Sequence, residues 1–147
     1  MGKIMLIGPV GAGKTSLIAT LQQEKKSIGK TSCIEFHDGA IDTPGEYAQI
    51  PRYYSALLVT AMEAALILVV QDAADAKVTL PPGFVGMFSR PVIGVVTKID
   101  VPGVDKERAK ARLAEAGVKG DVFYVSAHTG EGVESLLDYI AERGCTA

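Results

Sequence analysis

The sequence predicts one α/β domain of three layers (α/β/α), with helices on both faces of a mostly parallel sheet of about five or six strands and a short antiparallel edge. Apolar runs of strand length alternate with longer segments of helical period, which is the pattern of βαβ units. Apolar residues make up 48% of the 147 positions, which is enough for one core but too few for two full domains. We therefore expect residues 1–147 to form a single domain.

The predicted strands are short aliphatic runs, at 3–7, 32–36, 40–41, 65–70, 92–96 and 122–125. The predicted helices have apolar residues on one face or a proline in the first turn, and they lie at 14–23, 51–61, 84–88, 105–116 and 133–143. Segment 24–30 has no apolar period and is expected to be a loop. Asp38 and Gly39 are a hairpin-turn signal, so the strands on either side of them should pair antiparallel at one edge.

The composition argues against several classes of protein. A formal net charge of -2 with scattered lysines gives no basic stripe for nucleic acid. The apolar run 56–70 is interrupted by Glu63 and is shorter than the roughly 20 residues that a membrane span requires. The N-terminus lacks the parts of a secretory signal, and Cys33 and Cys145 stand far apart, so we expect a cytoplasmic protein with reduced thiols. The histidines lack the spacing of metal ligands and are expected on the surface.

A glycine-rich loop stands between the first predicted strand and the first predicted helix, and it matches the Walker A pattern of phosphate-binding loops. Its residues are Gly8, Pro9, Val10, Gly11, Ala12, Gly13, Lys14 and Thr15, and Ser16 follows them. The glycines let backbone N–H groups approach a phosphate closely, and the helix N-terminus adds partial positive charge. Lys14 should reach the β- and γ-phosphates, and the Thr15 hydroxyl is suited to Mg²⁺, which takes its other ligands from phosphate and water.

A second loop, Asp42-Thr43-Pro44-Gly45, follows a short predicted strand. It should therefore lie at the carboxyl edge of the sheet, where open α/β folds bind ligands. Asp42 can hold Mg²⁺ through a water molecule, and the Gly45 N–H can reach the γ-phosphate. The segment after Gly45 should then respond to the presence of that phosphate.

Two further loops are candidates for reading a purine base. One is Thr97-Lys98-Ile99-Asp100, which ends the strand 92–96 and is close to the Asn-Lys-x-Asp motif of guanine recognition. Asp100 can accept hydrogen bonds from both N1–H and the 2-amino group of guanine, whereas adenine offers neither donor. The Lys98 stem would lie along the base. The other loop, Ser126-Ala127, follows the strand 122–125 and supplies a backbone N–H for the guanine carbonyl oxygen.

These four motifs occur in the order found in Ras-like GTPases, which the chain resembles from residue 3 to about residue 143. More narrowly, the compact spacing from the phosphate loop to Lys30 and Thr31, then 34–36 and 41–47, resembles the EutP/PduV family of ethanolamine and propanediol utilisation. The resemblance implies a Rossmann-like P-loop fold that binds GTP or GDP with Mg²⁺, a role in amine or diol catabolism, and an association with bacterial microcompartments. It also implies Thr31 as the second Mg²⁺ ligand, with Ser32 as its rival.

The chain departs from ordinary Ras-like proteins at two functional positions. Thr97 replaces the asparagine that braces the phosphate loop and touches the purine, which weakens the inference of guanine preference and leaves ATP open. Glu46 replaces the glutamine that orients water after Asp-x-x-Gly. A carboxylate there would face developing phosphate charge, so hydrolysis with Lys14 and Glu46 as the catalytic residues should be slow.

Three functions are compatible with these residues. The first is a nucleotide-dependent switch or weak GTPase, in which Thr15, Thr31 and Asp42 organise Mg²⁺. The second is a kinase that transfers the γ-phosphate of ATP to a small acceptor such as acetate. The third is a non-catalytic module that carries a nucleotide and docks on a microcompartment shell protein. The sequence predicts neither nucleic acid nor a membrane as partner.

Overall fold

Strand β1 (Gly2–Ile7) occupies the centre of the sheet in the computed structural model, which describes residues 2–9, 11–21, 35–37, 40–74, 80–143 and 145–146. The other strands are β2 (Glu35–His37), β3 (Ala40–Asp42), β4 (Ala64–Asp72), β5 (Val92–Thr97), β6 (Val122–Tyr124) and β7 (Cys145–Thr146). Their order is β2-β3-β1-β4-β5-β6, and β7 pairs with the beginning of β1. All pairings are parallel except that of β2 with β3, which confirms the antiparallel edge.

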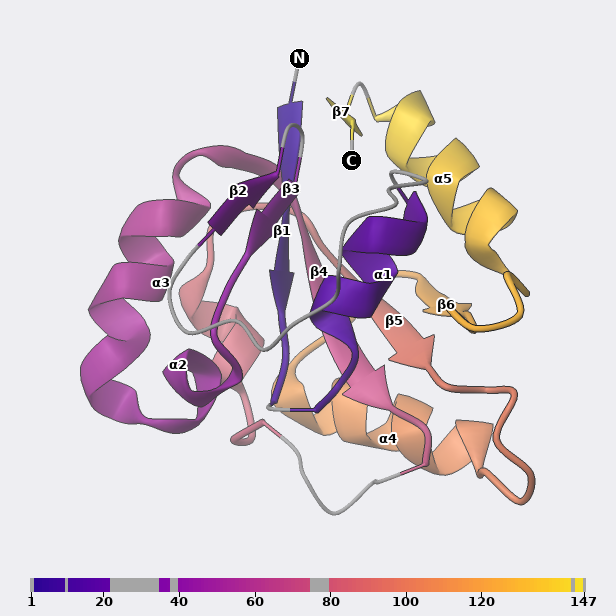
Figure 1. Cartoon of the computed structure of the whole chain (residues 1–147). Helices are drawn as coiled ribbons and strands as arrows, with labels where there is room; N and C mark the ends of the chain where they lie inside the picture. The colour runs from indigo at the N-terminus through magenta and orange to yellow at the C-terminus, as the bar shows by residue number, and fades with distance from the viewer. Residues whose placement is uncertain are drawn as a thin grey trace.

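Helices cover both faces of this sheet (Figure 1). They are α1 (Lys14–Leu21), α2 (Gly45–Gln49), α3 (Tyr54–Ala61), α4 (Lys106–Ala116) and α5 (Val133–Glu142), with short 3-10 turns η1 (Pro51–Tyr53) and η2 (Phe84–Met87). One apolar cluster joins α1 and α5 to the sheet, and the other joins α2, α3, η2 and α4 to the opposite face. The predicted three-layer α/β fold is therefore confirmed.

The alternation of side chains along β1 supplies both halves of the core. Ile4 and Leu6 pack in the cluster under α1 and α5, whereas Met5 and Ile7 pack in the cluster under α2, α3 and α4. All four side chains are fully buried. A strand buried on both faces is expected to be uniformly apolar, which is why these strands were readable as continuous aliphatic runs.

The termini of α4 follow from local chemistry. The Asp105 carboxylate accepts a hydrogen bond from the Arg108 backbone N–H and caps the first turn. Gly117 ends the helix in the left-handed region, at φ 106°. The predicted span 105–116 thus differs from α4 by the capping residue alone.

The structure differs from the predicted elements in several places. Helix α1 is described as far as Leu21, and the remainder of the predicted helix, the loop 24–30, residues 32–34 and the turn residues Asp38 and Gly39 lie outside the described residues. Strand β7 and helix α2 were not predicted, and β7 makes the sheet seven-stranded, where about five or six strands were predicted. In the described part of the chain, no helix combines the length and apolarity needed to cross a bilayer.

Candidate nucleotide-binding site

The glycine-rich loop leaves the carboxyl end of β1 and enters α1. A Cβ on Gly8 would stand 2.6 Å from the carbonyl oxygen of Val70 on β4, so this close approach requires glycine. Gly11 and Gly13 have φ values of 83° and 92°, in the left-handed region that glycine adopts without strain. Val10 lies outside the described residues. The loop therefore owes its path to the glycines that mark the Walker A pattern.

Lys14 is folded back over the loop from the first turn of α1. Its ammonium donates hydrogen bonds to the carbonyl oxygens of Gly8, at 2.8 Å, and Pro9, at 3.2 Å. Only 6% of the residue is exposed. Burial lowers the pKa of Lys14 from 10.5 to about 8, against the opposing charges of Asp42 and Glu46. The ammonium is thus a desolvated cation at the centre of the loop.

Oxygen donors for a magnesium ion lie beside this ammonium. The Thr15 hydroxyl donates to Oδ2 of Asp42 at 2.6 Å, and Asp42 is fully buried at the end of β3. Thr43, the next residue, donates to the carbonyl oxygen of Leu6 at 2.8 Å and so fixes this loop against β1. Among the described residues no group of three or more acidic, histidine or cysteine side chains could hold a metal. One hydroxyl and one carboxylate suit Mg²⁺ that arrives with phosphate and water ligands.

Thr97, at the end of β5, braces the phosphate loop. Its hydroxyl donates to the carbonyl oxygen of Ala12 at 2.7 Å and lies 3.4 Å from the carbonyl oxygen of Gln71. The exchange of asparagine for threonine therefore leaves the brace in place. The residue is 3% exposed, so this hydrogen bond is shielded from water.

Lys98 holds the neighbouring peptide of the same loop. Its ammonium donates to the carbonyl oxygen of Gly11 at 2.7 Å and to Oδ2 of Asp72 at 2.8 Å. The N–H of Ala12 donates to the carbonyl oxygen of Pro9, so the peptide between Gly11 and Ala12 is fixed at both ends. Lys98 has a φ of 62°, the one non-glycine residue with positive φ among the described residues. Such a conformation costs energy for a long side chain and marks a constrained position.

A cavity of about 420 Å³ extends from the phosphate loop across the ends of β5 and β6. This volume is in the range of small-molecule sites. Its lining residues are Gly13, Ser16, Thr20, Thr97, Lys98, Asp100, Val101, Ala127 and His128. The structure thus brings the predicted base-reading loops and the phosphate loop to one cavity.

Asp100 is oriented within that cavity by Ser126. The buried Ser126 hydroxyl donates to Oδ1 of Asp100 at 2.8 Å and accepts from the Thr129 N–H at 3.0 Å. The Ser126 N–H donates to the carbonyl oxygen of Glu131. Ser126 therefore positions the carboxylate, and Ala127 is the residue of this pair that lines the cavity.

Gly45 and Glu46 are predicted site residues that do not line this cavity. Gly45 is buried at the start of α2, and Glu46 follows in its first turn, close enough for its charge to raise the pKa of Lys14. Thr31 and Ser32 lie outside the described residues. Sequence reasoning missed Asp72 as a contact of Lys98, and it placed His128 on the surface without assigning it to the cavity. His128 lines that cavity.

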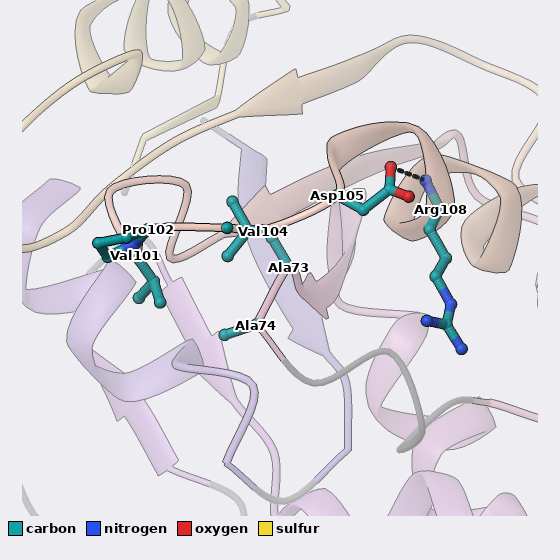
Figure 2. Close-up of a pocket in the computed structure, with 8 residues that line it drawn as sticks. Ala73, Ala74, Val101, Pro102, Val104, Asp105 and Arg108 are labelled. Carbon is teal, nitrogen blue, oxygen red and sulfur yellow. Dashed lines mark hydrogen bonds between the residues drawn. The ribbon is translucent and has the colours of Figure 1, made fainter.

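A smaller cavity of about 180 Å³ lies on the other side of the loop that follows Asp100. Figure 2 shows it between Ala73 and Ala74, which follow β4, the loop at Val101 to Val104, and Asp105 and Arg108 at the start of α4. It shares Val101 with the larger cavity and includes no residue of the phosphate loop or of 42–46. It is therefore separate from the predicted phosphate site.

A Walker A loop between the first strand and the first helix, with strand-end loops gathered around it, defines a P-loop α/β fold of the Ras-like kind. A solved structure with the same fold is that of a tyrosine-to-alanine variant of Era from Aquifex aeolicus bound to GDP and AlF4⁻, with a TM-score of 0.67 and 21% identity. The alignment covers 97% of this chain and 56% of that chain.

The chain belongs to the PduV-EutP family, described as ethanolamine utilisation and propanediol utilisation, whose sequence model matches residues 1–142. It is 40% identical to the propanediol utilization protein PduV of Citrobacter freundii over 141 residues, which are 95% of this chain and 93% of that protein. It is 38% identical over 143 residues to the "Probable acetate kinase EutP" of Escherichia coli K12, covering 96% of this chain and 90% of the relative. The predicted family is confirmed.

Proposed function

We propose that this protein binds a purine nucleoside triphosphate with Mg²⁺, prefers GTP, and acts as a slow GTPase or nucleotide-dependent switch. The observation that carries the proposal is the single cavity that joins Gly13 of the phosphate loop to Lys98, Asp100 and Ala127. A polyphosphate at the loop would extend its base toward these residues. The GTPase-fold neighbour bound to GDP supports the same class of ligand.

The preference for guanine rests on Asp100. Its carboxylate is oriented by Ser126 and lines the cavity, where it can accept from two donors on the guanine edge. Adenine would leave that carboxylate without these donors, at a cost of about 1–3 kcal/mol. The hydroxyl of Thr97 donates to the Ala12 carbonyl and so holds the phosphate loop in place of the usual asparagine. Discrimination between the two purines would then rest on Asp100.

The residues around the phosphate loop would bind the phosphates and Mg²⁺ and set the rate of hydrolysis. Lys14 and the loop N–H groups, from Gly8 to Ser16, would bind the phosphates, and Gly45 would meet the γ-phosphate. Thr15 and Asp42, with Thr31, would hold Mg²⁺, which supplies charge stabilisation to the phosphoryl group when bound. Glu46 carries a carboxylate near Lys14, and its charge opposes the negative charge that develops in hydrolysis. Turnover should therefore be slow.

Titration calorimetry with GTP, GDP, ATP and ADP, with and without Mg²⁺, tests this proposal. We expect GTP to bind roughly 5- to 150-fold more tightly than ATP, since the guanine edge gains about 1–3 kcal/mol. Lys14→Ala serves as the control that removes the central cation. Wild-type protein without measurable binding of any of the four nucleotides, or equal affinity of Lys14→Ala, would contradict the proposal.

A second candidate is an ATP-dependent acetate kinase, and it is favoured by the name of the Escherichia coli relative. In that reaction a carboxylate oxygen of acetate attacks the γ-phosphorus, the bond to the ADP oxygen breaks, and acetyl phosphate and ADP form. The acceptor would have to lie against the phosphate loop, because in-line transfer needs close contact. The smaller cavity of Figure 2 does not touch that loop, so it offers no acceptor site for this transfer.

Acceptor dependence separates the two activities. Release of phosphate from GTP and ATP should be measured with and without acetate, together with formation of acetyl phosphate as its hydroxamate. The switch proposal expects slow release that acetate does not change. Acetate-dependent formation of ADP and acetyl phosphate would replace it with the kinase.

Family membership supports a role in amine or diol catabolism in the cytoplasm, and the finer proposal is association with a microcompartment shell protein. Purified shells can be sedimented with this protein loaded with GTP, loaded with GDP, or free of nucleotide. A switch requires different affinity in the different states, because a ligand shifts an equilibrium only by its differential affinity. Equal co-sedimentation in all three states would instead indicate the non-catalytic docking module.

A further inference from the structure

Asp72 is the last residue of β4, and its carboxylate contacts Lys98. Lys98 lines the cavity of about 420 Å³ that also contains Asp100, which we call the base cavity. Its side chain is 12% exposed. Oδ1 accepts a hydrogen bond from the Ala74 N–H at 2.7 Å, which closes a short turn and fixes the orientation of the carboxylate. The Ala73 N–H donates to the carbonyl oxygen of Thr97, so this turn is attached to the end of β5.

The other carboxylate oxygen of Asp72 contacts Lys98, which also contacts the phosphate loop and lines the cavity. Oδ2 lies 2.8 Å from the Lys98 ammonium, and the same ammonium donates to the carbonyl oxygen of Gly11 at 2.7 Å. Lys98 also lines the large cavity. One lysine thus connects the end of β4, the phosphate loop and the base cavity.

The geometry of a lysine side chain does not by itself fix its ammonium in such a position. Its ammonium is a point charge on a flexible four-carbon stem, and the Lys98 side chain is 41% exposed, so solvent competes for its donors. Asp72 is much less exposed and is itself fixed by Ala74, so it can immobilise the ammonium. Its charge also balances the ammonium beside the phosphate loop.

We propose that Asp72 is a positioning residue for nucleotide binding, which acts through Lys98 by holding its ammonium on Gly11 and its stem along the wall of the base cavity. The inference rests on the proposed function, because it assigns a role within the same site. Asp72 is not part of the Walker A loop, the Asp-x-x-Gly loop or the base-reading loops.

A double-mutant cycle tests this role. Asp72→Asn keeps the shape and the contact with Ala74 but removes the charge, and Lys98→Met keeps the stem but removes the ammonium. Affinities for GTP and GDP are measured by titration calorimetry in the wild type, both single variants and the double variant. We expect Asp72→Asn alone to weaken binding roughly tenfold, the scale of a lost charge-assisted hydrogen bond.

In the Lys98→Met background the same substitution should cause no further loss. It should produce a small gain, because Asp72 without its lysine would leave an uncompensated negative charge near the polyphosphate. A structural role of Asp72 would instead weaken binding by the same factor in both backgrounds. That additive result, or an unchanged affinity of Asp72→Asn, would overturn the proposal.

Glu115→Gln is a matched control, because it also neutralises one carboxylate. Glu115 pairs with Arg112 on the exposed surface of α4, at 3.2 Å, and it is not among the residues that line the cavity. We expect its nucleotide affinities within twofold of the wild type. Equal losses in Glu115→Gln and Asp72→Asn would assign the effect to net charge and overturn the positioning role.

The test still decides the role of Asp72 if a variant does not fold, and it separates failure of this role from failure of the proposed function. If Asp72→Asn does not fold, Asp72→Glu replaces it in the cycle, and its loss must likewise vanish in the Lys98→Met background. If the wild type binds no purine nucleotide, the proposed function fails. If the wild type binds and the cycle is additive, the role of Asp72 alone fails.

Discussion

Replacing Lys14 with methionine should remove polyphosphate binding and should also change how the stability of the nucleotide-free protein depends on pH. Methionine has a similar length and no charge, so it can occupy the same buried space. In the wild type, burial lowers the pKa of Lys14 from 10.5 to about 8, which means that the folded protein carries a desolvated ammonium at a free-energy cost. Methionine removes that cost.

The magnitude follows from the two pKa values. At about 1.4 kcal/mol per pH unit, the interval from 10.5 to about 8 corresponds to about 3 kcal/mol at neutral pH. Methionine also leaves the carbonyl oxygens of Gly8 and Pro9 without their donor, at about 1–3 kcal/mol each. The two contributions oppose each other at pH 7, so the pH dependence of the stability difference is the quantity that reports the buried ammonium.

The pH dependence gives the prediction its sign. Between pH 8 and pH 10.5 the unfolded chain holds more protons on Lys14 than the folded protein does, so wild-type stability rises over this interval. Below pH 8 the penalty is fully present. Lys14→Met lacks the titrating group, so the free energy of unfolding of the wild type should rise by about 2 kcal/mol relative to that of Lys14→Met between pH 7 and pH 10.

Urea unfolding of both proteins, without nucleotide, at pH 7, 8, 9 and 10 measures this difference. All other ionisable side chains are common to both proteins, so their contributions cancel in the comparison. A difference in unfolding free energy that stays constant from pH 7 to pH 10 would refute the argument that burial depresses the pKa of Lys14.

Substitutions at three further positions have defined outcomes. Gly8→Ala should lower the melting temperature by several degrees in thermal unfolding, because its Cβ would meet the Val70 carbonyl oxygen at 2.6 Å. An unchanged melting temperature would mean that β4 can move away from Gly8 without loss of stability. Thr97→Val should cost about 1–3 kcal/mol in urea unfolding by leaving the Ala12 carbonyl unpaired, while Thr97→Ser should retain most of the stability; equal losses would contradict the brace. Asp100→Ala should weaken GTP binding roughly tenfold or more but inosine triphosphate much less, since inosine lacks the 2-amino group; equal losses in calorimetry would exclude base reading by Asp100.

The elements that the sequence predicted correctly carry their signal locally. Strands β1, β4 and β5 are continuous aliphatic runs because both of their faces are buried, and α4 has its own capping residues at both ends. Strand β7 has two residues and is defined by its pairing with β1. No local sequence pattern indicates that pairing. Helix α2 has five residues, too few to display a helical period.

In the candidate site, too, the loops with a local sequence signal could be predicted, whereas contacts between distant residues could not. The loops at 8–15, 42–45, 97–100 and 126–127 were predicted together because the carboxyl ends of parallel strands meet at one edge of a sheet. The partner of the Thr97 hydroxyl lies 85 positions away, at Ala12, so its role could not be read from residue type. Asp72 lies in no motif. Its place at the end of a central strand was the one signal in the sequence that could have indicated it.

The donors around the phosphate loop explain why threonine can stand in place of asparagine. In a planar trans peptide the C=O and N–H groups point in opposite directions, so a donor that fixes one carbonyl also orients the next N–H. Thr97 holds the Ala12 carbonyl, so the planar peptide directs the Gly13 N–H away from Thr97. This orientation needs one donor of suitable reach, and a hydroxyl supplies it as well as an amide. The substitution therefore preserves the hold on the glycine-rich loop, and under the proposed function any change in nucleotide preference would come from groups that line the cavity and reach the base.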